Sequence, residues 1–150
     1  MATKKFDSKF SKIITEMVEI AFEYVDYNKK EIDAIYIYSS LEDNNFFYNI
    51  FYCVNGQLTK LHKLNDISKK QYDLSDKRTF GLLGLGNKYL QEIKKLFIED
   101  EREVPTQMKM VYYPKTEKFS TDISYEIYWS NNTELLPSDI FQQWYTEIEG

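Results

Sequence analysis

The chain contains one cysteine and one histidine, Cys53 and His62, and these are the only candidates for a thiol nucleophile and its imidazole base. Such a pair must lie within hydrogen-bond distance. The dipeptide Asn55-Gly56 predicts a tight hairpin turn, which places Cys53 opposite Leu58 and leaves His62 four residues further along the ladder. At roughly 3.4 Å per residue, the separation is on the order of 13 Å. We therefore expect no cysteine–histidine pair and interpret Cys53 as a small buried side chain.

Three closely spaced glycines, Gly81, Gly84 and Gly86, superficially suggest a phosphate-binding loop. Their spacing matches neither common motif. A dinucleotide fingerprint needs G-x-G-x-x-G after a strand, and a P-loop needs Lys and Ser or Thr directly after its last glycine, whereas Asn87 and Lys88 follow here. We interpret the segment as the start of a helix or as a point of close helix packing. The alternative is an anion site at a helix N-terminus.

Asp122 and Glu126 form a regular pair of carboxylates, four residues apart on the polar face of a predicted strand. On a strand this spacing separates them by roughly 13 Å, too far to share a proton or to flank one bond as in a retaining glycosidase. The acidic runs 42–43 and 99–103 are typical of a hairpin tip and a solvated helix end. We expect no catalytic residue, no metal site and no cofactor, and interpret the carboxylates as solvated groups or as contacts for a basic protein.

Two periodicities predict the elements that carry these residues. Apolar side chains recur every three or four positions in the helical segments and every second position in the strands. Residues 65–78 are polar and read as a loop with one helical turn around 67–72. In chain order, we predict a helix over about 8–27, strands over 32–40, 46–54 and 57–64, a helix over about 87–99 that begins several residues earlier, strands over 107–113 and 119–129, and a helix that begins at Pro137 and runs through Ile148.

This order predicts an α+β fold, in which an antiparallel sheet of about five strands has its helices packed on one face. A length of 150 residues suits a single domain over 1–150, and no repeat or linker divides it. No stretch approaches the roughly 20 apolar residues of a membrane-spanning helix. We see no secretory signal, and a single cysteine agrees with a reducing compartment. We therefore expect a cytoplasmic protein without membrane contact.

The charge balance is acidic, with 19 Lys and Arg against 24 Asp and Glu and a formal net charge of -5. Direct binding to nucleic acid is disfavoured, because affinity for phosphates comes largely from clustered Lys and Arg. An acidic protein can still bind a basic protein.

Thirteen tyrosines are the least explained part of the composition. Many fall on predicted strands, where both faces cannot be equally buried, so some must face water. Tyrosine is enriched at protein interfaces because it combines a large apolar area with a polar end. Aromatic residues are also good strand formers, and that explanation is equally open.

Several segments together resemble the YezG-like antitoxin family, the immunity proteins of bacterial polymorphic toxin systems. The resemblance runs from the first helix almost to the end of the chain. It rests on the opening amphipathic helix, the hairpin IYIYSSLEDNNFFYNIFY, the helix KYLQEIKKLFIEDERE, the paired strands QMKMVYYPKTEKFSTDISYEIYW and the LLPSD that begins the last helix.

The resemblance implies a non-enzymatic inhibitor that binds the C-terminal toxin domain, often a nuclease, of a secreted or contact-delivered effector. A carboxylate-bearing surface rimmed by aromatic residues could occupy the basic cleft with which a nuclease holds phosphate. The principal alternative is a small-molecule or peptide-binding α+β module without catalysis, and an enzyme comes third. Chosen from charge and predicted exposure, the expected partner contacts are Glu42, Asp43, Glu99, Asp100, Glu101, Glu103, Asp122, Glu126 and Tyr128.

Overall fold

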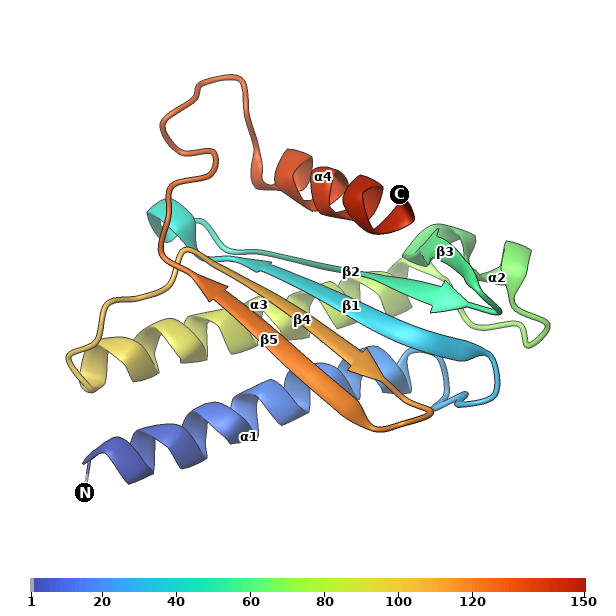
Figure 1. The fold of residues 1–150 in the computed structure, drawn as a ribbon, viewed down its shortest axis with the longest axis horizontal. Helices are drawn as coiled ribbons and strands as arrows, with labels where there is room; N and C mark the ends of the chain where they lie inside the picture. Colours follow the sequence, from blue (N-terminus) through green and yellow to red (C-terminus); the bar gives the residue numbers. More distant parts are fainter. Residues whose placement is uncertain (1) are drawn as a thin grey trace.

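The computed structural model describes residues 2–150, with side chains from residue 5 onward, and has the predicted α+β architecture. Its antiparallel strands form one sheet in the order β3-β2-β1-β4-β5. Figure 1 shows α1 and α3 side by side across one face of this sheet and α4 across the other. The elements are α1 (Ala2–Glu23), β1 (Ile32–Ser40), the 3-10 turn η1 (Glu42–Asn44), β2 (Phe47–Val54), β3 (Gln57–Lys60), the 3-10 turn η2 (Leu61–Lys63), α2 (Leu64–Ile67), α3 (Asp76–Glu99), β4 (Gln107–Tyr113), β5 (Lys118–Ser124) and α4 (Pro137–Glu149).

The main core lies between the sheet and the helix pair α1 and α3. Met17 and Ala21 of α1 are fully buried there, together with Leu90 and Ile93 of α3. Each large apolar side chain buried in this way contributes roughly 1.5–3 kcal/mol. The hydroxyl of Tyr52 donates a hydrogen bond to the carbonyl of Ala21 at 2.6 Å, which ties β2 to α1. This core holds the two helices in fixed positions beside each other.

The last helix, α4, packs on the opposite face of the sheet, so the prediction that the helices cover one face is wrong. Its residues Phe141 and Trp144 meet Tyr38 and Phe51, and the ring centroids of Phe51 and Trp144 lie 5.1 Å apart. β1 and β2 carry aromatic side chains on the face that points away from α1 and α3. A strand that is apolar on both faces requires a cover on both faces, and α4 supplies the second one.

The hairpin between β2 and β3 has the predicted turn. Asn55 and Gly56 have φ values of 50° and 80°, as a type I′ turn requires. β3 is shorter than predicted, because the chain turns into η2 after Lys60 and then into the short helix α2. His62 therefore lies outside the sheet.

β5 ends at Ser124 and not at Trp129 as predicted. Among the described strands its only neighbour is β4, which begins at Gln107, the partner of Ser124. Later residues therefore find no described strand to bond. Alternation of apolar and polar residues continues beyond this point, but Ile127 is 62% exposed. Trp129 instead joins the aromatic cluster under α4, where its indole N–H donates to the hydroxyl of Ser40 at 3.1 Å.

The three glycines lie inside α3, which begins at Asp76. A mid-helix position leaves no free helix N-terminus at the glycines, so the alternative of an anion site there is wrong. Gly86 packs directly on β2, because a Cβ at this position would lie 2.0 Å from the ring of Tyr48. Close helix packing is therefore confirmed at Gly86. A Cβ at Gly81 or Gly84 would meet nothing within 4 Å.

Candidate functional site

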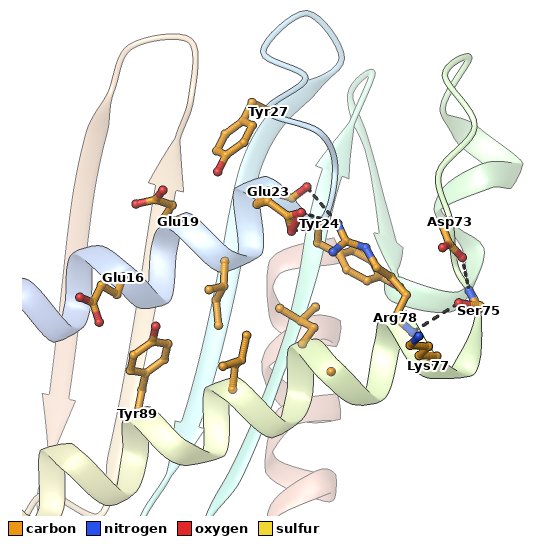
Figure 2. A pocket seen from close by; sticks show the side chains of 14 residues that line it. Glu16, Glu19, Glu23, Tyr24, Tyr27, Asp73, Ser75, Lys77, Arg78 and Tyr89 are labelled. Carbon is orange, nitrogen blue, oxygen red and sulfur yellow. Dashed lines mark hydrogen bonds and ion pairs between the residues drawn. The ribbon is translucent and has the colours of Figure 1, made fainter.

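A groove of about 910 Å³ lies between α1 and α3 and opens to solvent (Figure 2). Both helices pack on the sheet through their apolar stripes. The sides of α1 and α3 that face each other, further from the sheet than the core, form the two walls of the groove. The segment that follows α1 and the segment that precedes α3 close one end. The groove brings together four carboxylates and three tyrosines, and we treat it as the candidate site.

One wall of the groove carries three glutamates of α1, Glu16, Glu19 and Glu23. Steps of three and four residues place their side chains on one side of the helix. Like charges at this spacing repel each other, by an amount comparable to the few tenths of a kcal/mol that an opposite pair contributes. The row therefore does not stabilise the isolated helix. A cation placed against it would relieve the repulsion.

Arg78 of α3 balances one of the three glutamates. Its guanidinium lies 2.9 Å from Oε2 of Glu23, donates to the Glu23 carbonyl at 3.2 Å, and rests over the ring of Tyr24, 5.2 Å from the centroid. Hydrogen bonding to Glu23 raises the pKa of Arg78 further above its usual range. Among the side chains that the structure describes, residues 5–150, none forms an ion pair with Glu16 or Glu19. These two carboxylates, like that of Asp73, have no cationic partner among the described side chains.

Two tyrosines stand beside these carboxylates, Tyr89 on α3 and Tyr27 just after α1 (Figure 2). Desolvation and the neighbouring Glu16 raise the pKa of Tyr89, and desolvation and Glu19 raise that of Tyr27. Both hydroxyls are therefore protonated at neutral pH and can donate hydrogen bonds. The ring of Tyr27 packs edge-on against Phe22 at 5.1 Å, yet Tyr27 is 48% exposed. It presents an aromatic surface at the mouth of the groove.

The lining of the groove suits a cation and repels an anion. Carboxylates attract ammonium and guanidinium groups, and both cations also bind favourably over aromatic ring faces. A phosphate group would meet a surplus of negative charge instead. The acidic lining residues are Glu16, Glu19, Glu23 and Asp73, and the basic ones are Lys77 and Arg78.

Glu42 is not the exposed acidic contact that the sequence suggested, because it is only 3% exposed. Its carboxylate accepts hydrogen bonds from the backbone N–H groups of Tyr128 at 2.8 Å, Trp129 at 3.1 Å and Ser130 at 2.5 Å. Burial opposes its ionisation, but the hydrogen bonds from Ser130, Tyr128 and Trp129 outweigh burial and hold the pKa of Glu42 below its usual value. Glu42 therefore fastens the segment that follows β5.

The remaining carboxylates of the two predicted acidic runs lie outside the groove. Asp100 is half-buried, and its carboxylate accepts a hydrogen bond from Nε of Arg102 at 2.6 Å. The others are solvated, as expected for a turn and a helix end. The exposed members are Asp43, Glu99, Glu101 and Glu103.

The prediction that Asp122 and Glu126 lie on one face of the same strand is wrong. Asp122 is exposed on β5, opposite Lys109 of β4, whereas Glu126 lies beyond the end of the strand. Tyr128 is half-buried, and its hydroxyl donates to the Ser124 hydroxyl at 2.6 Å. The predicted carboxylates are thus spread over η1, the end of α3 and the β5 region.

The lone thiol is not activated. Cys53 lies opposite Leu58, as predicted, and His62 belongs to η2. Burial raises the pKa of the Cys53 thiol, and the nearby carboxylate of Asp33, 3.9 Å from the sulfur, raises it further. A nucleophilic cysteine needs the opposite shift.

Sequence reasoning did not single out the groove residues Glu16, Glu19, Tyr27 and Tyr89. The regular spacing of the glutamates is visible in the sequence, but the solvated face of an ordinary helix looks the same. The missing information is which helix packs beside α1, because that neighbour supplies Tyr89 and the second wall.

No protein-family model matches this chain, and no curated protein matches it significantly. Within residues 2–150, no helix has the length and apolar character needed to cross a bilayer. The same residues contain no cluster of three or more His, Cys, Asp or Glu side chains placed to hold a metal ion.

Proposed function

We propose that this chain is an immunity protein, which binds and neutralises the toxin domain of a cognate bacterial effector in the cytoplasm and uses the groove between α1 and α3 as its main contact. The observation that carries the proposal is the pair of unbalanced carboxylates, Glu16 and Glu19, beside Tyr27 and Tyr89. The sequence resemblance to YezG-like antitoxins supplies the biological class.

The physical basis is complementarity of charge and surface. A nuclease that holds phosphate exposes Lys and Arg in its cleft, and those side chains match the acidic lining of the groove. Long-range attraction would speed the encounter of the two proteins. The exposed parts of Tyr27 and of Leu85, which is 44% exposed, would then be buried and slow dissociation. Inhibition of this kind requires no reacting residue in the chain.

The second candidate is a binding module for a cationic peptide or small molecule without catalysis. The volume of the groove favours it, because about 910 Å³ falls within the range of roughly 300–1,000 Å³ that is common for ligand sites. The open shape of the groove and its row of like charges along one wall favour an extended protein partner over a small enclosed ligand.

The decisive experiment starts from the neighbouring gene, which should encode a large protein with a toxic C-terminal domain. Co-expression of this chain with that domain should restore growth, and the purified pair should form a complex. The variant Glu16→Gln with Glu19→Gln should slow association and reduce the dependence of the rate on salt. The matched control, Glu99→Gln with Glu101→Gln, removes the same charge outside the groove. It should lower the association rate only by the general effect of the reduced net charge.

The outcomes separate the possibilities. Equal effects of the two double variants would remove the groove from the interface and leave only a general charge effect. Failure of the chain to rescue growth or to bind the neighbouring domain would overturn the immunity function itself. Saturable binding of a lysine- or arginine-containing peptide in the absence of any toxin would support the second candidate.

A further inference from the structure

The two edges of the sheet are built differently. β3, at one edge, is four residues long and continues directly into η2 and α2. β5, at the other edge, is seven residues long and pairs with β4 in a regular register, and none of the strands within residues 2–150 lies on its outer side. It contains no proline. An edge of this kind offers its unpaired N–H and C=O groups to another strand.

An apolar hollow of about 320 Å³ adjoins this edge on the face that α1 covers. Phe119 of β5 and Tyr112 of β4 line one side, and Val18 and Phe22 of α1 line the other. Phe119 is 42% exposed although it lies on the face of β5 turned toward the core. An exposed apolar surface beside an unpaired edge is typical of an interaction site.

The flank of α1 next to this hollow carries few charges. Ser11, Thr15, Val18 and Phe22 follow one another at steps of three and four residues and form one row along the helix, which Asp7 continues toward the N-terminus. Glu19 stands beside this row and also lines the hollow. The charged residues Lys9, Lys12, Glu16 and Glu23 of α1 do not line it.

We propose that β5 pairs antiparallel with β5 of a second copy of this chain, so that the sheet continues across a twofold axis. When Ser120 lies opposite Ser120 of the second copy, Lys118 lies opposite Asp122 and Asp122 lies opposite Lys118. Opposite charges directly across an antiparallel ladder attract each other, and the twofold axis gives this pair twice. The strand is therefore complementary in charge to itself.

The same axis accounts for the surfaces beside the strand. It stands perpendicular to the sheet and keeps α1 of both copies on the same face. The α1 flanks beside the two hollows then face each other, and the apolar hollows beside Phe119 become covered. This inference rests on the β5 edge and the hollow beside it. It does not require the groove between α1 and α3 to bind a partner, although Glu19 and Tyr27 line both the groove and the hollow.

Sedimentation equilibrium of the purified full chain, over a wide range of concentration, tests the proposal. The wild-type protein should show a reversible monomer–dimer equilibrium. The single variants Lys118→Asp and Asp122→Lys place like charges opposite each other and should each weaken dimerisation by about tenfold or more. The double variant restores the opposite-charge pairs and should recover most of the lost affinity.

A second pair of variants tests the apolar part of the contact. Phe119→Glu should abolish the dimer, whereas Ile98→Glu, which places the same charge at a 55% exposed position on α3, should not. Thermal unfolding of each variant shows whether the monomer is intact. A wild-type chain that is monomeric at every concentration would overturn the proposal. A dimer that neither single charge variant weakens would overturn it as well, because the contact would then lie elsewhere.

Discussion

The contact of Gly86 in α3 with Tyr48 in β2 gives a sharp test of the fold. A Cβ at Gly86 would lie 2.0 Å from Cδ2 and 2.3 Å from Cγ of Tyr48. Tyr48 is only 3% exposed and is enclosed by the main core. Because the overlap reaches the base of the ring, the ring cannot avoid it by turning alone. Either β2 or α3 must move.

The expected magnitude follows from two opposing effects. The change Gly86→Ala gains roughly 0.5–1 kcal/mol of helix stability, as does any Gly→Ala change inside a helix. Overpacking of a core position costs roughly 1–3 kcal/mol, and overlap at a ring base belongs at the upper end of that range. We therefore expect a net loss of about 2 kcal/mol of unfolding free energy. Gly84→Ala and Gly81→Ala meet no neighbour and should be stabilising by roughly 0.5–1 kcal/mol.

Urea unfolding followed by far-UV circular dichroism measures these differences, and an unchanged slope against denaturant confirms that the comparison is valid. Combining Gly86→Ala with Tyr48→Leu should lose less stability than the sum of the two single changes, because the smaller side chain makes room for the new methyl group. If Gly86→Ala proves as stable as Gly84→Ala, then α3 does not approach β2 as described and the reasoning is refuted.

Two further predictions concern Glu42 and Glu31, whose carboxylates accept several hydrogen bonds. Glu42→Gln should lower the free energy of unfolding by about 1–3 kcal/mol, because the amide cannot satisfy three backbone donors as the carboxylate does. The control Asp43→Asn, at the exposed neighbouring position, should have little effect in the same thermal or chemical unfolding experiment. Equal effects of the two changes would contradict the buried role of Glu42. Hydrogen bonds from Asn55 and from the backbone of Lys69 lower the pKa of Glu31 from 4.5 to about 2. A carboxylate whose pKa is lower in the folded than in the unfolded chain stabilises the folded state at pH values above its unfolded pKa. This contribution of Glu31 should therefore be lost as the pH falls from about 4.5 toward 2. The difference in unfolding free energy between wild type and Glu31→Gln should therefore shrink over that interval, and a constant difference would show that the charge is not involved.

Local patterns in the sequence predict elements whose ends are set by local chemistry. The bounds of β1 and β4, the start of α4 at Pro137 and the turn at Asn55-Gly56 agree with the structure because alternation, a proline at the first helical position and positive φ are properties of the segment itself. The predicted boundary fails at β5. Its apolar alternation runs on to Trp129, but a strand also needs a partner, and β4 supplies none beyond the pairing of Gln107 with Ser124.

The site depends even more on tertiary contacts. Glu42 carries the same charge as Asp43 and precedes it directly, yet it is buried because backbone donors from 128–130 reach it across a long sequence separation. The groove likewise requires α1 and α3 to lie side by side. Nothing in the spacing of Glu16 and Glu19 reveals that Tyr89 will stand opposite them.

The position of α4 gives the molecule a built-in optical reporter. Trp129 and Trp144 are its only tryptophans, and both lie in the cluster under α4, on the far side of the sheet from the main core. Tryptophan emission therefore reports whether the C-terminal helix is seated, while circular dichroism follows the bulk of the secondary structure. If emission changes at a lower denaturant concentration than ellipticity, α4 detaches from the sheet before the core formed by α1, α3 and the sheet unfolds.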